Sequence, residues 1–144
     1  MVNTRRLVEL HITAFVYAFV DAGEWVALLG GRATPQGREQ FRRRLASRPL
    51  LRLDRATDLC GVSALEAAGR LRELGAGDDA VFVKEGLQRD ELTTVESAVQ
   101  RTWQSGEAAI VSCVPGRLGL FQDASGHRYL LRAIDDDAGE RGSV

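Results

Sequence analysis

Cys60 and His127 are the side chains whose types could together support covalent catalysis. A cysteine thiolate is a nucleophile, a nearby imidazole can act as its base, and Asp135 could orient that imidazole. Cys60 and His127 lie 67 positions apart, so only the fold could bring them together. The sequence offers no evident glutamine or backbone nest that would stabilise an oxyanion.

The order of the expected elements resembles that of papain-like cysteine peptidases. Cys60 lies near the start of a helix, as their nucleophile does, and Gly126-His127 is similar to the Gly-His pair that opens their histidine strand. The resemblance implies a hydrolase that uses Cys60, His127 and Asp135. Each residue also has a plainer interpretation, because Cys60 falls in a turn and His127 follows the hairpin turn at 123–126. We therefore expect binding rather than catalysis, with the cysteine hydrolase as the alternative.

A second set of candidate residues could contact phosphate groups. Arginine forks match phosphate oxygens, and a hydroxyl at a helix start can contribute a hydrogen bond. The arginines lie on two expected helices, Thr34–Ser47 and Ala64–Gly75, and the hydroxyl belongs to the residue that precedes the second helix. The candidate nucleic-acid-binding residues are Arg38, Arg42, Arg43, Arg44, Ser63, Arg70 and Arg72.

The segment that carries part of this set resembles the helix-turn-helix of bacterial winged-helix regulators. It runs over Arg48–Gly75, where a basic-proline stretch leads into an expected short helix, a Gly61-Val62-Ser63 turn and a second helix that closes in Arg-Leu-Arg-Glu-Leu-Gly. The resemblance implies that Ala64–Gly75 is a recognition helix, that Thr34–Ser47 is the first helix of the motif and that Ala80–Lys84 is part of a wing. It covers about 28 of the 144 residues.

Two features of this segment argue against sequence-specific DNA recognition. Ala64, Leu65, Ala68 and Gly69 would be the first residues offered to a major groove, and none of their side chains can hydrogen-bond a base edge. Residues 54–100 also carry 10 acidic against 5 basic side chains, which repels phosphate. We therefore expect a small bacterial regulatory protein with a winged-helix-like core, which binds duplex DNA or a protein partner. A non-enzymatic protein-interaction or adaptor module is the alternative.

Composition limits the domain count, the compartment and the kinds of cofactor that the chain could have. The 144 residues are 44% hydrophobic and 27% charged with a net charge of −1, which predicts one globular domain over 1–137 and a flexible tail over 138–144. Two cysteines form no disulfide framework or zinc motif, so we expect a cytoplasmic protein without metal or cofactor. The longest apolar stretch, Ile12–Val20, is too short to cross a membrane, and a homodimer is compatible with the sequence.

The fold class predicted from the spacing of apolar residues is α+β, with a helical N-terminal half, a further helix and an antiparallel C-terminal sheet. For residues 12–20 a strand is the alternative to a helix, because β-branched and aromatic side chains are frequent there. The expected helices are Arg5–Val20, Thr34–Ser47, Asp54–Cys60, Ala64–Gly75 and Thr94–Gln104. Three of them have predicted caps: the Thr34 hydroxyl before Pro35, a Ser63-to-Glu66 capping box and a Thr93-to-Glu96 capping box. The expected strands are Ala80–Lys84, Ala108–Val114, Arg117–Gln122 and His127–Ile134.

Overall fold

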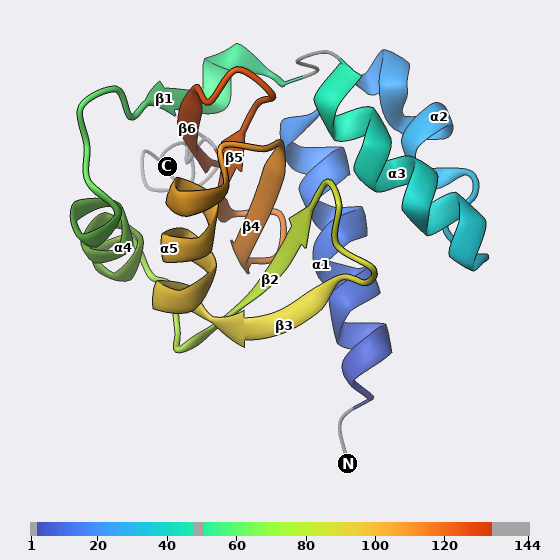
Figure 1. The fold of residues 1–144 in the computed structure, drawn as a ribbon, viewed down its shortest axis with the longest axis horizontal. Helices are drawn as coiled ribbons and strands as arrows, with labels where there is room; N and C mark the ends of the chain where they lie inside the picture. The colour runs from blue at the N-terminus through green and yellow to red at the C-terminus, as the bar shows by residue number, and fades with distance from the viewer. Residues whose placement is uncertain (1–2, 48–50, 134–144) are drawn as a thin grey trace, which may run out of the picture.

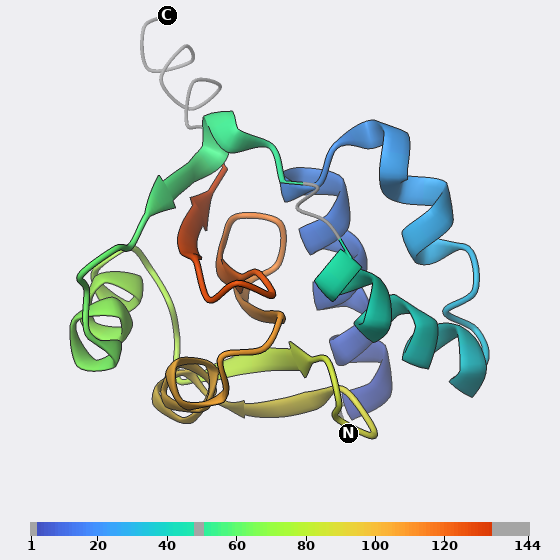
Figure 2. The same cartoon turned by 45° about the horizontal axis from the view of Figure 1, so that its top comes forward.

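A computed structural model describes residues 3–47 and 51–133 of the chain (Figure 1). They form a six-stranded antiparallel sheet in the order β1-β6-β5-β4-β2-β3, with helices on both of its faces (Figure 2). The predicted α+β class is confirmed. The strands are β1 (Ala56–Asp58), β2 (Asp79–Lys84), β3 (Glu91–Thr94), β4 (Ala109–Val114), β5 (Leu118–Gln122) and β6 (Arg128–Arg132).

The sheet separates two hydrophobic cores, because successive residues of a strand point to opposite faces. In β2, Val81 and Val83 belong to one core, whereas Ala80 and Phe82 belong to the other. The helices α1 (Thr4–Phe19), α2 (Trp25–Leu29) and α3 (Pro35–Ser47) cover the first core. The helices α4 (Ala64–Glu73) and α5 (Val95–Ser105) cover the second.

Residues 12–19, for which the sequence left a helix and a strand open, belong to the α1 helix. It begins after Asn3, whose side-chain oxygen accepts a hydrogen bond from the backbone N–H of Arg6 at 3.2 Å. Its buried side chains recur at helical spacing and include Ile12, Phe15 and Phe19. Burial of this stripe against the sheet outweighs the strand preference of the β-branched residues.

The α3 helix begins as its sequence predicts, and its start is unusually tight. The Thr34 hydroxyl accepts a hydrogen bond from the Gly37 backbone N–H at 3.0 Å, and Pro35 occupies the first helical position. A side chain at Gly37 would collide with the backbone of Gly31, whose carbonyl oxygen lies 1.6 Å from an ideal Cβ. Two glycines therefore allow the turn after α2 to fold onto the first turn of α3.

The α4 helix also begins and ends where the sequence indicates. Ser63 and Glu66 form the predicted capping box, with reciprocal hydrogen bonds of 3.0 and 3.1 Å. Gly75 follows the helix with a φ of +120°. The cap of α5 is displaced by one residue from the expected Thr93-to-Glu96 box, because Thr94 caps the backbone N–H of Ser97.

The predicted helix over Asp54–Cys60 is wrong. Residues Leu53–Arg55 form a single 3₁₀ turn, and Ala56–Asp58 form β1, which pairs with the edge of β6. The backbone N–H of Leu59 extends this pairing through a 2.9 Å hydrogen bond to the carbonyl of Arg128. Within residues 51–75, a strand, a turn and a helix thus replace the expected helix-turn-helix. Residues 48–50, where the motif was expected to start, lie outside the described residues.

The four predicted strands are confirmed over the described residues, although β2 is not a wing. Ile134, the expected end of the last strand, and the tail predicted over 138–144 lie outside the described residues. It lies inside the sheet between β3 and β4, and residues 80–83 are buried. The strand β3, which pairs with β2 over Glu91–Thr94, was not predicted from the sequence. It has only four residues, the last of which is the cap of α5, and these are too few for an alternating pattern to stand out.

Candidate functional site

The candidate DNA-binding residues do not form one surface. Arg38, Arg42, Arg43 and Arg44 belong to α3, whereas Ser63, Arg70 and Arg72 belong to the cap and body of α4. Figure 1 shows α3 and α4 at opposite sides of the molecule, with the sheet between them. The arrangement in which both helices meet one duplex, as in a helix-turn-helix, is therefore absent from the described residues.

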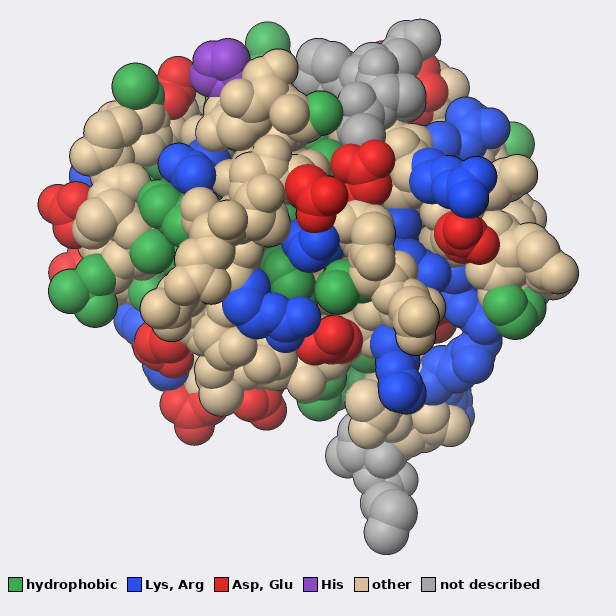
Figure 3. All heavy atoms as spheres, viewed as in Figure 1, with side chains coloured by type: hydrophobic (Ala, Val, Ile, Leu, Met, Phe, Trp, Pro, Cys, Tyr) green, Lys and Arg blue, Asp and Glu red, His purple; other side chains and the backbone are tan. Residues whose placement is uncertain are grey.

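Most of these groups are already bonded within the fold. Arg42 is buried and pairs with Asp90 at 2.8 Å, and the exposed Arg43 pairs with Glu39 at 2.9 Å. Arg38 donates to the backbone carbonyl of Arg32 at 2.9 Å. Arg44 is exposed. Basic side chains are numerous on the side of the molecule that α1 and α3 form, and acidic side chains lie among them (Figure 3).

On α4, the hydroxyl of Ser63 is occupied by its capping hydrogen bond. Arg72 donates to both carboxylate oxygens of Glu96 at 2.9 Å and to Asp78 at 3.0 Å. The hydrogen bonds that Arg72 donates to Glu96 and Asp78 raise the pKa of Arg72, and the bond to Glu96 lowers the pKa of that carboxyl group. Arg70 is the remaining exposed arginine of this group.

The structure does not join the proposed catalytic residues. Cys60 and His127 adjoin Leu59 and Arg128, which pair at the end of β1 and β6, so the two residues lie at the same end of the sheet. Among the residues from 51 to 133, no hydrogen bond links the Cys60 thiol to the His127 ring. The His127 Nδ1 instead lies 3.6 Å from the carboxylate of Asp123. Asp135, the third member of the predicted set, lies outside the described residues.

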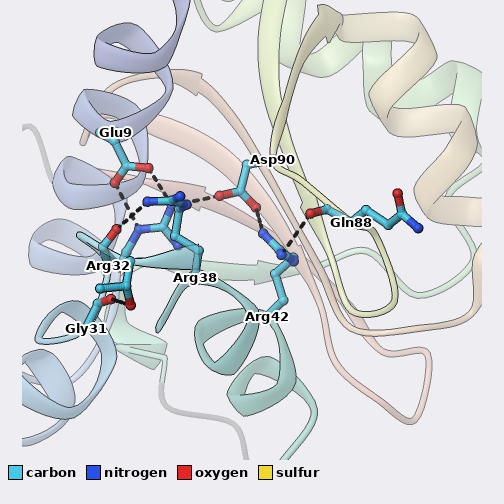
Figure 4. Close-up of polar contacts among 8 residues, drawn as sticks. Glu9, Gly31, Arg32, Arg38, Arg42, Gln88 and Asp90 are labelled. Atoms are coloured by element: carbon cyan, nitrogen blue, oxygen red, sulfur yellow. Dashed lines mark hydrogen bonds and ion pairs between the residues drawn. The ribbon is translucent and has the colours of Figure 1, made fainter. Parts of the chain in front are cut away.

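A cluster of two arginines and two carboxylates, buried except for the half-buried Glu9, is the most developed polar feature of the described residues (Figure 4). It was not predicted from the sequence. Arg32 donates to both oxygens of Glu9, at 3.0 and 2.7 Å, and to Asp90 at 2.7 Å. Asp90 in turn accepts from Arg42, which also donates to the carbonyl of Gln88 at 3.2 Å. The side chains of Arg32, Arg42 and Asp90 are 5%, 6% and 3% exposed.

Four separate elements supply this cluster. Glu9 comes from α1, Arg32 from the turn after α2, Arg42 from α3, and Asp90 from the loop before β3. Burial opposes the charge of Arg32, but the hydrogen bonds to Glu9 and Asp90 outweigh it and raise the pKa of Arg32. The Arg32 guanidinium also lies 4.7 Å from the centre of the Phe41 ring. The cluster fixes α1, α3 and the β2–β3 loop relative to one another.

The solvent-facing side of α1 and α2 carries exposed apolar side chains. Leu10 and Tyr17 are 57% and 50% exposed and lie seven residues apart on α1, which places them on one face. The Tyr17 ring packs edge-on against Trp25, with 4.8 Å between the ring centres. Val26 follows Trp25 and is 85% exposed. We call Leu10, Tyr17, Trp25 and Val26 the α1–α2 apolar face.

Two further findings concern membranes and metals. None of the helices in the described parts of the chain combines the length and apolar character needed to cross a membrane. Nor do residues 3–47 and 51–133 contain a group of three or more His, Cys, Asp or Glu side chains placed to hold a metal ion.

Comparisons with known proteins add no family to this description. The chain matches no protein-family model, no curated protein and no solved structure. The likeness to winged-helix regulators and to cysteine peptidases therefore stays a prediction from the sequence.

Proposed function

We propose that this protein is a small non-enzymatic regulatory module that acts by binding another protein through its α1–α2 apolar face. The observation that carries the proposal is the exposure of Leu10, Tyr17 and Val26 on adjacent helices. The Tyr17 and Trp25 rings join the two helices by direct contact, and contiguous exposed apolar side chains are typical of protein-interaction surfaces. Tyrosine and tryptophan, both present here, are enriched where partners contribute most binding energy.

The chemistry of the face indicates the partner. Arg5 and Arg6 lie one to two turns before Leu10 on α1, and Asn3, Arg5, Arg6, Glu9, Leu10 and Thr13 line a shallow hollow there. Glu9 is engaged by Arg32, so the charge at this end of the face is positive. A matching partner segment carries apolar side chains next to acidic ones.

Duplex DNA is the competing proposal, and the contacts support it less. Arg42, Arg43 and Arg72 already pair with carboxylates, so phosphate would have to displace them. Fluorescence anisotropy with a labelled duplex at low salt tests it. Salt-dependent binding that weakens when Arg38, Arg43 and Arg44 become alanine would favour DNA.

Site-specific photocrosslinking tests the protein-partner proposal. A photoreactive amino acid is placed at Tyr17 and, as the matched control, at Leu65, which is 82% exposed on α4. We expect position 17 to crosslink one protein in the native cell extract and position 65 not to. Equal capture at both positions would count against the face, and capture of a second copy alone would replace the heterologous partner with a homodimer.

A further inference from the structure

A groove lies beside the buried arginine cluster, between the N-terminal half of α1, α3 and the β2–β3 loop. Its volume is about 350 Å³, and its polar lining includes Arg5, Glu9, Arg38, Arg42, Arg89 and Asp90. Pockets for small ligands begin at roughly 300 Å³. Figure 4 shows the side chains of Arg32 and Arg42 meeting at Asp90, with Arg38 beside Arg32.

The charges around the groove do not balance. Glu9 and Asp90 are the two carboxylates, and both are bound by the buried Arg32 and Arg42. Arg38 donates to a neutral acceptor, the carbonyl of Arg32. Arg5 and Arg89 are exposed and form no hydrogen bond or ion pair with any residue in 3–47 or 51–133. Arg5, Arg38 and Arg89 are therefore left without a hydrogen-bonded carboxylate. The nearby Glu91, on which Arg89 acts electrostatically, is itself paired with Arg101.

Buried arginines that are held by hydrogen bonds form one wall of the groove. Arg42 lines it, is nearly fully buried and is held by Asp90 and by the carbonyl of Gln88. The Arg42 Nε–H and one terminal nitrogen of Arg32 are enclosed without an acceptor among the described residues. The hydrogen-bonding capacity of the buried arginines thus exceeds what the two carboxylates use. Such hydrogen bonds hold the lining side chains in place before a ligand binds, which lowers the entropy cost of binding.

We propose that this groove binds a small anion of the diphosphate class. Each phosphate group carries about −1.5 to −2 charges at neutral pH, so two linked groups match three unpaired arginines, whereas one carboxylate does not. Arginine forks bind phosphate oxygens in pairs, which suits Arg5, Arg38 and Arg89 as the first contacts. The groove shares Arg5 with the positively charged end of the α1–α2 apolar face, but the inference does not depend on the partner proposed for that face.

Isothermal titration calorimetry with inorganic pyrophosphate at low ionic strength tests the inference. We expect saturable one-site binding to the wild-type chain and at least tenfold weaker binding to the R5Q/R89Q double variant. The matched control is R70Q, which removes an exposed arginine of α4 on the other side of the sheet and should leave the affinity unchanged. Circular dichroism and urea midpoints equal to those of the wild type show that the variants are folded.

Three results would overturn the inference. The folded wild type fails to bind pyrophosphate, R70Q loses as much affinity as R5Q/R89Q, or citrate binds as tightly as pyrophosphate. Citrate carries about the same charge on carboxylates, so equal affinity would show that the groove does not select phosphate. Thermal unfolding with and without pyrophosphate gives a second reading, because a ligand bound only by the folded chain raises Tm.

Discussion

Asp90 and Arg42 form a buried ion pair, 2.8 Å between Oδ1 and Nη1, that ties the loop before β3 to α3 across 48 residues of sequence. Arg32 shares the other oxygen of the same carboxylate at 2.7 Å. Asp90 is therefore shared by two buried guanidinium groups and is the carboxylate that pairs with Arg42, whereas Arg32 also pairs with Glu9. The pairing holds the helical layer of α1 and α3 against the β2–β3 end of the sheet.

Asp90→Ala should therefore destabilise the fold strongly. The substitution leaves two buried arginines short of a counter-charge, and breaking a buried pair in this way costs about 3–5 kcal/mol. Urea unfolding followed by circular dichroism measures the change in the free energy of unfolding. The matched control is Glu39→Ala, which removes the exposed partner of Arg43 and should cost less than about 1 kcal/mol. Similar losses in both variants would contradict the structural role of Asp90.

Gly37→Ala should destabilise the chain although alanine is the better helix former. The new Cβ would lie 1.6 Å from the Gly31 carbonyl oxygen, so the α2–α3 turn must move, and such overpacking costs about 1–3 kcal/mol. In α4, Gly69 has no atom within 4 Å of an ideal Cβ. Gly69→Ala should therefore stabilise by up to about 1 kcal/mol. The two urea midpoints should shift in opposite directions, and a shift of both in the stabilising direction would rule out the tight turn.

His11 should make stability depend on pH near neutrality. The ring is buried and its Nδ1 lies 2.8 Å from the Ser112 hydroxyl, and burial lowers the pKa of His11 below 6.5. The unfolded chain then takes up a proton at a higher pH than the folded chain does. Stability is therefore full above about pH 6.5 and falls as the pH drops toward the folded-state pKa.

Urea unfolding at pH 7.5 and pH 5.0 measures this dependence. The double variant His11→Leu/Ser112→Ala removes both polar groups together, and we expect it to lose less stability between the two pH values than the wild type. The carboxylates with lowered pKa, such as Glu91 and Glu96, titrate at lower pH than this interval. An unchanged pH dependence in the double variant would exclude His11 as its source.

The two cysteines should differ sharply in reactivity. Cys60 is exposed, whereas Cys113 is buried in the second core, and burial raises the pKa of the Cys113 thiol to about 12. A thiol-specific chromogenic disulfide should modify one thiol in the native protein and two after unfolding in urea. The Cys60→Ser variant should show no rapid native reaction. Fast modification of both thiols in the native chain would contradict the burial of Cys113.

The sequence predicted local features better than distant ones. The caps at Thr34 and Ser63 depend on residues three positions apart, so they could be inferred directly. The same is true of the buried stripe of α1, where periodicity identified the helix. These features follow from short-range hydrogen bonds and from the burial of one helix face.

Two parts of the structure depend on contacts that no local pattern records. Residues Ala56–Asp58 follow an acidic residue that could cap a helix, yet they add to the sheet because the edge of β6, more than 70 residues later, offers its backbone groups. Arg32 and Asp90 lie in turns and pair across 58 residues. Single charged residues in turns are normally solvated, so no local pattern indicates that these two side chains pair. The buried cluster could only be found once the helices were placed.

The binding surface proposed for this protein is tested most directly by affinity measurements with the partner captured at Tyr17. The dissociation constant is measured for the wild-type chain and for the Leu10→Glu, Tyr17→Glu and Leu65→Glu variants, each checked for an unchanged urea midpoint. We predict that Leu10→Glu and Tyr17→Glu each weaken binding by about tenfold or more, because an interface residue that contributes 1.4 kcal/mol changes the affinity tenfold. Leu65→Glu should have no effect. Unchanged affinity in the two α1 variants, or an equal loss in Leu65→Glu, would contradict the assignment of the α1–α2 apolar face.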